Sequence, residues 1–96
     1  MKAEKRLLWW ILIASSGGQN RARILKELIK NPCNANELSK ILKLDYKTTR
    51  HHLEVLQKNR LIISSSEEYN KVYFPSDMLG NNIEIFNEIW VKIGKK

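Results

Sequence analysis

Residues 34–56 read NANELSKILKLDYKTTRHHLEVL, and this stretch decides the fold. Asn34 is a good N-cap, and Glu37 follows it at the spacing of a capping box, with Asn in place of the usual Ser or Thr. Apolar residues then recur at helical spacing. They predict a short helix that ends near Lys43, with an apolar face made of Leu38, Ile41 and Leu42.

A second capped helix follows Asp45, whose charge suits the positive end of a helix, and we expect it to run to about Asn59. Leu44 lies in the turn between the two helices and can pin them together. One predicted face of the second helix holds Thr49, His52, Leu53 and Leu56. The opposite face is polar and mostly basic, with Tyr46, Lys47, Arg50, His51, Glu54, Gln57 and Lys58. The pair of helices therefore has the pattern of a helix-turn-helix unit.

A β-hairpin is predicted directly after this unit. Residues 61–65 and 71–74 are rich in β-branched and aromatic side chains, residues 66–70 form a polar link, and Pro75 closes the pair. A hairpin in this position would be the wing of a winged helix-turn-helix.

Another helix is predicted before the unit, from an N-cap at about Asn20 to Lys30, where Asn31-Pro32 stops it. Its apolar stripe is Ile24, Leu25, Leu28 and Ile29. Its basic residues fall mostly outside that stripe, namely Arg21, Arg23, Lys26 and Lys30.

The two ends of the chain carry more apolar surface than the core of so small a domain can bury. Residues 7–13 are apolar on every side, which favours a buried helix within residues 1–16, with a buried strand as the alternative. The last predicted helix, residues 77–94, has a wide apolar stripe. Such surfaces indicate a homodimer. The interface residues that we predict are Leu8, Trp9, Leu12, Ile83, Phe86, Trp90 and Ile93.

The amino-acid composition limits the classes of protein to which the chain can belong. The 96 residues suit a single domain, and 17 Lys and Arg against 10 Asp and Glu give a net charge of +7. This excess favours an anionic partner, with nucleic acid first and an acidic membrane surface second. A single cysteine, Cys33, fits a reducing cytoplasm, and no apolar run reaches the roughly 20 residues that span a bilayer. We therefore expect a cytoplasmic protein with no membrane segment.

The basic face of the second helix suits DNA recognition. Arg50 can donate twice to guanine, and Lys47 can reach the same base edge or a phosphate. Thr48 and the first N–H groups of the helix can bind a phosphate, because the start of a helix is electropositive. The DNA-binding residues that we predict are Tyr46, Lys47, Thr48, Arg50, His51, Lys58 and Lys71.

Residue types that usually carry catalysis or hold metals have simpler roles here. His51 and His52 are adjacent in a helix and point about 100° apart, so they cannot grip one metal together. We expect His52 and Cys33 to be small packing residues. We found no phosphate-binding loop, dinucleotide fingerprint or metal-ligand spacing. The sequence therefore predicts no enzyme activity, no cofactor and no metal.

Residues 34–56, together with Gly17-Gly18-Gln19-Asn20-Arg21-Ala22-Arg23, resemble the core of ArsR-like regulators, especially a compact group common in archaea. The resemblance covers residues 17–75 well and the ends loosely. It implies DNA contacts by Tyr46, Lys47, Thr48, Arg50 and His51, and packing of the first and last helices between two subunits. Two features depart from the family: there is no cluster of sensor ligands beside Cys33, and the wing tip is acidic, with Glu67 and Glu68.

The expected fold is mostly α with a small β-hairpin (α+β), a winged helix-turn-helix with extra N- and C-terminal helices. Residues 1–96 would be one domain, with a dimerisation helix in 1–16, a winged-helix core in 19–75 and a second dimerisation helix in 77–94. The expected function is sequence-specific binding of double-stranded DNA by a dimeric transcriptional regulator. The alternatives are a non-specific architectural DNA-binding protein and a winged-helix module that binds other proteins.

Overall fold

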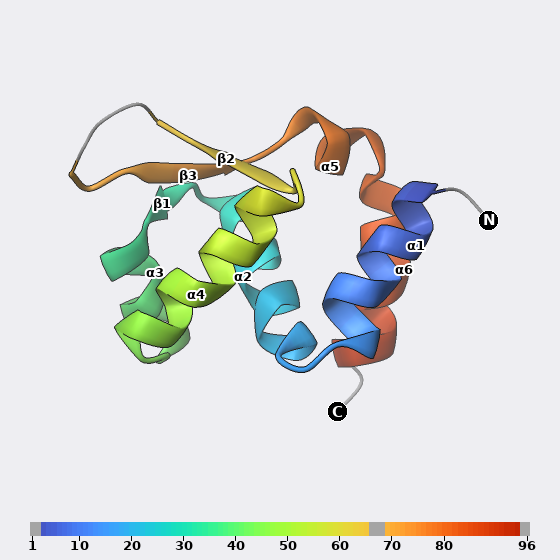
Figure 1. The fold of residues 1–96 in the computed structure, drawn as a ribbon, viewed down its shortest axis with the longest axis horizontal. Coiled ribbons are helices and arrows are strands. Elements are labelled where there is room, and N and C mark those ends of the chain that lie inside the picture. Colours follow the sequence, from blue (N-terminus) through green and yellow to red (C-terminus); the bar gives the residue numbers. More distant parts are fainter. Residues whose placement is uncertain (1–2, 66–68, 95–96) are drawn as a thin grey trace.

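The computed structural model describes residues 3–65 and 69–94. Glu67 and Glu68, which we expected at the wing tip, lie outside the described residues. The elements follow the order α1 (Ala3–Trp9), η1 (Trp10–Ala14), α2 (Gly18–Lys30), β1 (Cys33–Asn34), α3 (Ala35–Leu42), α4 (Tyr46–Lys58), β2 (Ile62–Ser64), β3 (Val72–Pro75), α5 (Asp77–Asn81) and α6 (Ile83–Gly94). Figure 1 shows α2, α3 and α4 beneath a small sheet, with α1 and α6 side by side at the other end of the molecule.

The helix-turn-helix formed as the sequence predicted. The capping box of α3 is complete, since Glu37 N donates to Asn34 Oδ1 at 2.8 Å and Asn34 N donates to Glu37 Oε1 at 3.0 Å. Lys43 ends the helix in the left-handed region with φ 58°. Asp45 then caps α4 by accepting a hydrogen bond from Thr48 N at 3.0 Å. Local capping chemistry therefore fixes both ends of the turn.

The sheet has three antiparallel strands in the order β1-β3-β2. β2 and β3 are the predicted hairpin, and Ile63 pairs with Phe74. No pattern in the sequence indicates β1, because a strand of two residues is too short to show alternation. β1 matters for function, since its pairing of Cys33 with Tyr73 draws the start of α3 against the wing.

The C-terminal segment is two helices and not the single helix that we predicted. The break lies at Asn82, whose Nδ2 donates to Met78 O at 2.8 Å and whose backbone carbonyl accepts from Phe86 N at 3.2 Å. Asn82 thus closes α5 and opens α6. Asparagine competes with the helix for backbone groups in this way, and an apolar stripe cannot reveal it.

The N-terminal segment is helical, which excludes the buried strand. α1 widens into a π-helical turn, η1, in which Ser15 N donates to Trp10 O at 3.0 Å. The chain then turns at Gly17, with φ 83°, and passes so close to η1 that a Cβ on Gly18 would strike Leu12 O. The Gly-Gly pair therefore permits a close crossing of η1 and α2.

Burial divides the predicted dimer residues into two groups. Leu8, Leu12 and Phe86 are fully buried within the single chain, where they join the main core. The other four are only partly buried and pack on the edge of that core, namely Trp9, Ile83, Trp90 and Ile93. Trp10 and Val91, which we did not predict, are 61% and 58% exposed. No helix in the described part of the chain combines the length and apolar character that crossing a bilayer would need.

Candidate nucleic-acid interface

The two faces of α4 lie as the sequence predicted. Its inner side chains are all buried, namely Thr49, His52, Leu53 and Leu56. Its predicted DNA-binding side chains are all exposed, namely Tyr46, Lys47, Thr48, Arg50, His51 and Lys58. Lys71, at the entry to β3, is exposed as well.

The exposed side chains of α4 form an outer row and a flank. Lys47, His51, Glu54 and Lys58 recur at helical spacing opposite the buried face, and we call them the outer row. Tyr46, Arg50 and Gln57 lie on the flank toward the sheet, since Gln57 Nε2 donates to Ser64 Oγ of β2 at 3.0 Å. Thr48 lies on the other flank, where its hydroxyl is 3.3 Å from Asp45 Oδ2. The six predicted residues on α4 therefore occupy three different settings, and Lys71 lies off this helix, just before β3.

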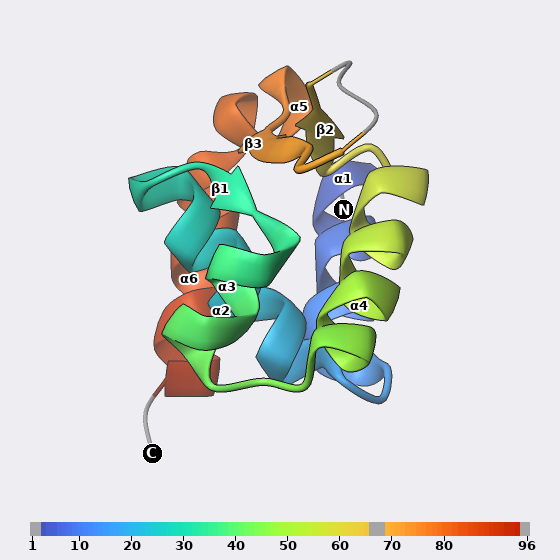
Figure 2. The same ribbon diagram turned by 90° about the vertical axis from the view of Figure 1, so that its left-hand side faces the viewer.

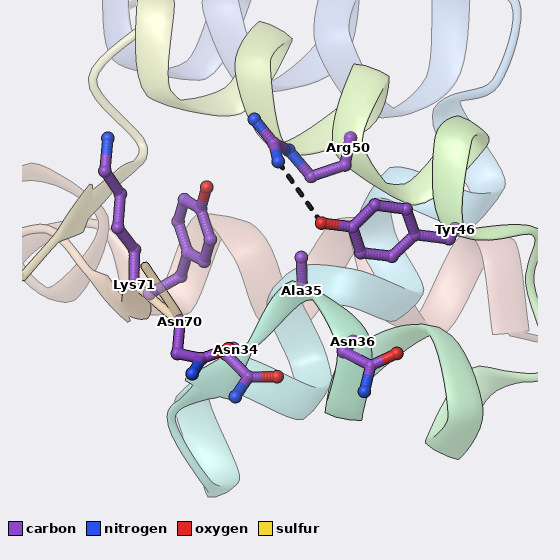
Figure 3. A pocket seen from close by; sticks show the side chains of 8 residues that line it. Asn34, Ala35, Asn36, Tyr46, Arg50, Asn70 and Lys71 are labelled. Atoms are coloured by element: carbon purple, nitrogen blue, oxygen red, sulfur yellow. Dashed lines mark hydrogen bonds between the residues drawn. The ribbon is translucent and has the colours of Figure 1, made fainter. Parts of the chain in front are cut away.

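The flank toward the sheet borders a cavity of about 140 Å³ between α3, α4 and β3, which we call the α3–α4–β3 cavity. Figure 3 shows Arg50 and Tyr46 turned toward each other, with Asn34, Ala35 and Asn36 across from them and Lys71 to one side. Arg50 Nη1 donates to Tyr46 Oη at 3.3 Å, and the guanidinium carbon lies 6.0 Å from the Tyr46 ring centroid. The hydrogen bond to Tyr46 is the main cause that raises the pKa of Arg50. The cavity thus holds a fixed positive charge.

Several lining residues were not predicted from the sequence. They are Asn34, Ala35, Asn36, Asn70 and Tyr73. The pairing of β1 with β3 brings them beside Arg50, and no pattern in the sequence predicts that pairing.

Behind α4 lies a buried polar contact that the sequence also missed. Arg21, expected outside the core, is 5% exposed and points its guanidinium at His52 of α4, with Nη1 3.3 Å from His52 Nδ1. Arg21 also donates to Ile11 O at 3.1 Å and to Ser16 O at 2.9 Å. Ile11 lies in η1 and Ser16 in the turn that follows, so Arg21 of α2 joins this part of the chain to α4. Burial lowers the pKa of both Arg21 and His52.

Cys33 is a buried free thiol, as the sequence predicted. Burial is the main cause that raises its pKa to about 11, with Glu37 and Glu27 as smaller causes. In residues 3–65 and 69–94, no three His, Cys, Asp or Glu side chains gather where they could hold a metal ion.

Residues 18–64 match the sequence model of the family described as bacterial regulatory protein, arsR family. The comparison with curated proteins gave no match. Among solved structures, the chain is similar to reduced HlyU from Vibrio cholerae, with 22% identity, a TM-score of 0.65, and coverage of 96% of this chain and 90% of that one.

Two further structures share the fold. One is the homodimeric winged helix-turn-helix DNA-binding domain Mb0332 from Mycobacterium bovis, with 14% identity, a TM-score of 0.69, and coverage of 96% and 81%. The other is an ArsR-like transcriptional regulator from Rhodococcus sp. RHA1, with 23% identity, a TM-score of 0.65, and coverage of 96% and 80%. The chain has the winged helix-turn-helix fold, and its residues 18–64 are similar to the helix-turn-helix of the arsR family.

Proposed function

We propose that this chain is a transcriptional regulator of the ArsR family that binds double-stranded DNA as a homodimer. The observation that carries the proposal is the outer row of α4, a polar and mostly basic surface on an ArsR-type helix-turn-helix. A helix of this kind fits the major groove, and its cations can neutralise phosphates. The net charge of +7 supports the same partner.

The contacts divide according to the position of each side chain on α4. The outer row points straight away from the core, so Lys47 and His51 are placed to donate to base edges and Glu54 to accept from cytosine. Lys58 and Lys71 are assigned to phosphates, and Thr48 to the phosphate nearest the start of α4. Tyr46 and Arg50 contact DNA from the flank.

The homodimer uses the N- and C-terminal segments, residues 1–16 and 77–94, while residues 19–75 form the DNA-binding core. Two exposed apolar side chains, Trp10 and Val91, and the partly buried Trp9, Trp90 and Ile93 would face the partner. The similar Mb0332 domain is homodimeric. Leu8, Leu12 and Phe86 support these side chains from the core beneath.

A selection experiment tests sequence-specific recognition. The purified protein is mixed with a library of random duplexes at near-physiological salt, and the retained DNA is sequenced. We expect a two-fold symmetric motif whose half-sites lie about one helical turn apart. Retained DNA without a motif would favour an architectural protein, and no retained DNA would favour a protein-interaction module.

The remaining parts of the proposal follow from this function. We infer a cytoplasmic location, regulation and not catalysis, and DNA binding that needs neither a metal nor a cofactor. The likeness to the compact archaeal group stays a prediction, since the three solved structures above come from bacteria.

A further inference from the structure

The α3–α4–β3 cavity has the composition of an anion site. Its eight described lining residues include two cations, Arg50 and Lys71, and no carboxylate. They come from three separate parts of the chain, namely the start of α3, the flank of α4 and the entry to β3. Figure 3 shows the labelled side chains around one opening.

Tyr73 supplies a donor that the fold itself does not use. Its side chain is 6% exposed and lines the cavity, and its hydroxyl makes no hydrogen bond to the described residues. No fully buried side-chain nitrogen or oxygen in the described chain lacks a partner, so this hydroxyl has accessible surface, and Tyr73 lines the cavity. Tyr73 is also the second cause of the raised pKa of Arg50, which places the two groups near each other. A hydroxyl beside a cation, with no partner among the described residues, can donate to an anion in the cavity.

The start of α3 adds a backbone donor. The first four N–H groups of a helix have no partner inside it, and the capping box satisfies those of Asn34 and Glu37. The pairing of Asn34 with Val72 turns the Ala35 N–H toward the Lys71 carbonyl, which leaves the N–H of Asn36, a residue that lines the cavity. This N–H group lies at the electropositive end of an eight-residue helix.

The position of the cavity in the fold identifies the anion. If α4 enters the major groove, as the proposed function requires, the phosphate backbones that border the groove pass along the flanks of α4. Figure 2 shows this face, with α4 and α3 side by side and β2 and β3 above them. The cavity lies in the angle between these elements.

We propose that the α3–α4–β3 cavity seats one phosphate of the DNA backbone, held by Arg50, Lys71 and the Tyr73 hydroxyl. The N–H group of Asn36 completes the site. The inference rests on the proposed function and differs from the sequence prediction at one point: it assigns Arg50 to the DNA backbone and not to guanine. Its hydrogen bond to Tyr46 holds it on the flank, away from the outer row.

The deciding variant is Tyr73→Phe, which removes the hydroxyl and keeps the ring. Tyr69→Phe is the matched control, since Tyr69 is 81% exposed at the wing. The dissociation constant is measured on the selected duplex and on a random duplex. We expect Tyr73→Phe to weaken both by about tenfold, because a donor to an ionised phosphate is lost, and Tyr69→Phe to change neither. Urea unfolding of each variant separates lost binding from lost folding.

Arg50→Gln separates a backbone contact from a base contact. A phosphate contact predicts the same fold-loss on the selected and the random duplex, whereas a guanine contact predicts a loss on the selected duplex alone. Replacing single phosphates by neutral methylphosphonates then locates the site. When the contacted phosphate is the one replaced, the wild type and Tyr73→Phe should bind the duplex with the same affinity.

A probe without DNA keeps this inference distinct from the proposed function. Inorganic phosphate is titrated into the labelled protein, and we expect the amide signal of Asn36 to move in the wild type and less in Tyr73→Phe. If that signal moves but no duplex binds, the anion site stands and the proposed function is wrong. If duplexes bind, but Tyr73→Phe binds them as tightly as the wild type does at every methylphosphonate position, the proposed phosphate site is wrong.

Discussion

At the scale of single residues, the contact between Arg21 and His52 helps to hold α4 in its position against α2. His52 Nδ1 accepts a hydrogen bond from Arg21 only while the imidazole is neutral. Protonation would set a second positive charge beside the guanidinium in a largely buried place. Burial, Arg21 and then His51 all lower the pKa of His52, so the folded state keeps it neutral.

This contact makes stability depend on pH. The unfolded chain protonates His52 near the ordinary histidine pKa of 6.5, and the folded chain, in which this pKa is lowered, does so only at lower pH. Unfolded protein therefore binds more protons in that window, and the free energy of unfolding falls as the pH drops below about 6.5, levelling off below the folded pKa. Urea unfolding between pH 7.5 and 5 measures the slope. His52→Gln should flatten it, whereas the exposed His51→Gln should not; an unchanged slope in His52→Gln would refute this role.

Glycine is required at one place in the crossing of η1 and α2. A Cβ on Gly18 would collide with Leu12 O, a backbone atom that cannot swing away. We expect Gly18→Ala to lower the free energy of unfolding by roughly 1–3 kcal/mol. Gly80→Ala is the control, since nothing lies within 4 Å of its added Cβ, and it should be neutral or stabilising by up to about 1 kcal/mol. Equal effects of the two changes would contradict the close crossing.

Cys33 should be inert in the folded protein. Its thiol is buried and its pKa is raised to about 11, so the reactive thiolate is scarce at neutral pH. We expect an aromatic disulfide reagent at pH 7.5 to label Cys33 only after urea unfolds the chain. Rapid labelling without urea would show that the site opens in the folded state.

At the scale of elements, the sequence predicted best where local chemistry is decisive. Both helices of the helix-turn-helix are bounded by side-chain caps, at Asn34 and Asp45, and those caps formed. The hairpin followed from β-branched and aromatic residues on both sides of a polar link. These signals lie within a few residues of the structure that they specify.

The elements that the sequence missed depend on distant partners. β1 exists because β3 pairs with it, and the break at Asn82 reflects side-chain hydrogen bonds that interrupt an apolar stripe. Arg21 is buried because η1 supplies carbonyls for its guanidinium. For the same reason, the sequence found the exposed half of the candidate site on α4 but not Tyr73 and the start of α3.

At the scale of the whole molecule, the terminal helices pack together at one end of the fold, and their buried side chains join the same core as the winged helix. α1 lies against α6, with Lys5 Nζ 3.9 Å from Glu88 Oε1. Lys92 and Lys26 lie over the rings of Trp9 and Trp90. The exposed Trp10 and Val91 lie on these same terminal elements, where the proposed partner would cover them.

We expect the chain to be a dimer at micromolar concentration. Trp10→Ser removes a side chain that is 61% exposed on η1, and it should shift the mass in solution toward the monomer. Tyr69→Ser, at an even more exposed aromatic residue of the wing, should leave the dimer intact. Light scattering during size-exclusion chromatography gives both masses; a monomeric wild type would remove the basis of two-fold recognition.

The central claim is that α4 binds DNA through its outer row, and one comparison of charge-matched variants tests it most directly. The double variant K47Q/K58Q removes two positive charges from the outer row, and K26Q/K92Q removes two from the terminal-helix side. Affinity for a labelled duplex is measured by anisotropy over a range of salt, after the mass of each variant has been checked. We predict that K47Q/K58Q binds roughly tenfold or more weakly, with a salt slope lower by about two or more, because the phosphate contact assigned to Lys58 is lost in both subunits. K26Q/K92Q should bind as the wild type does. Equal losses in the two variants, or a larger loss in K26Q/K92Q, would contradict the account.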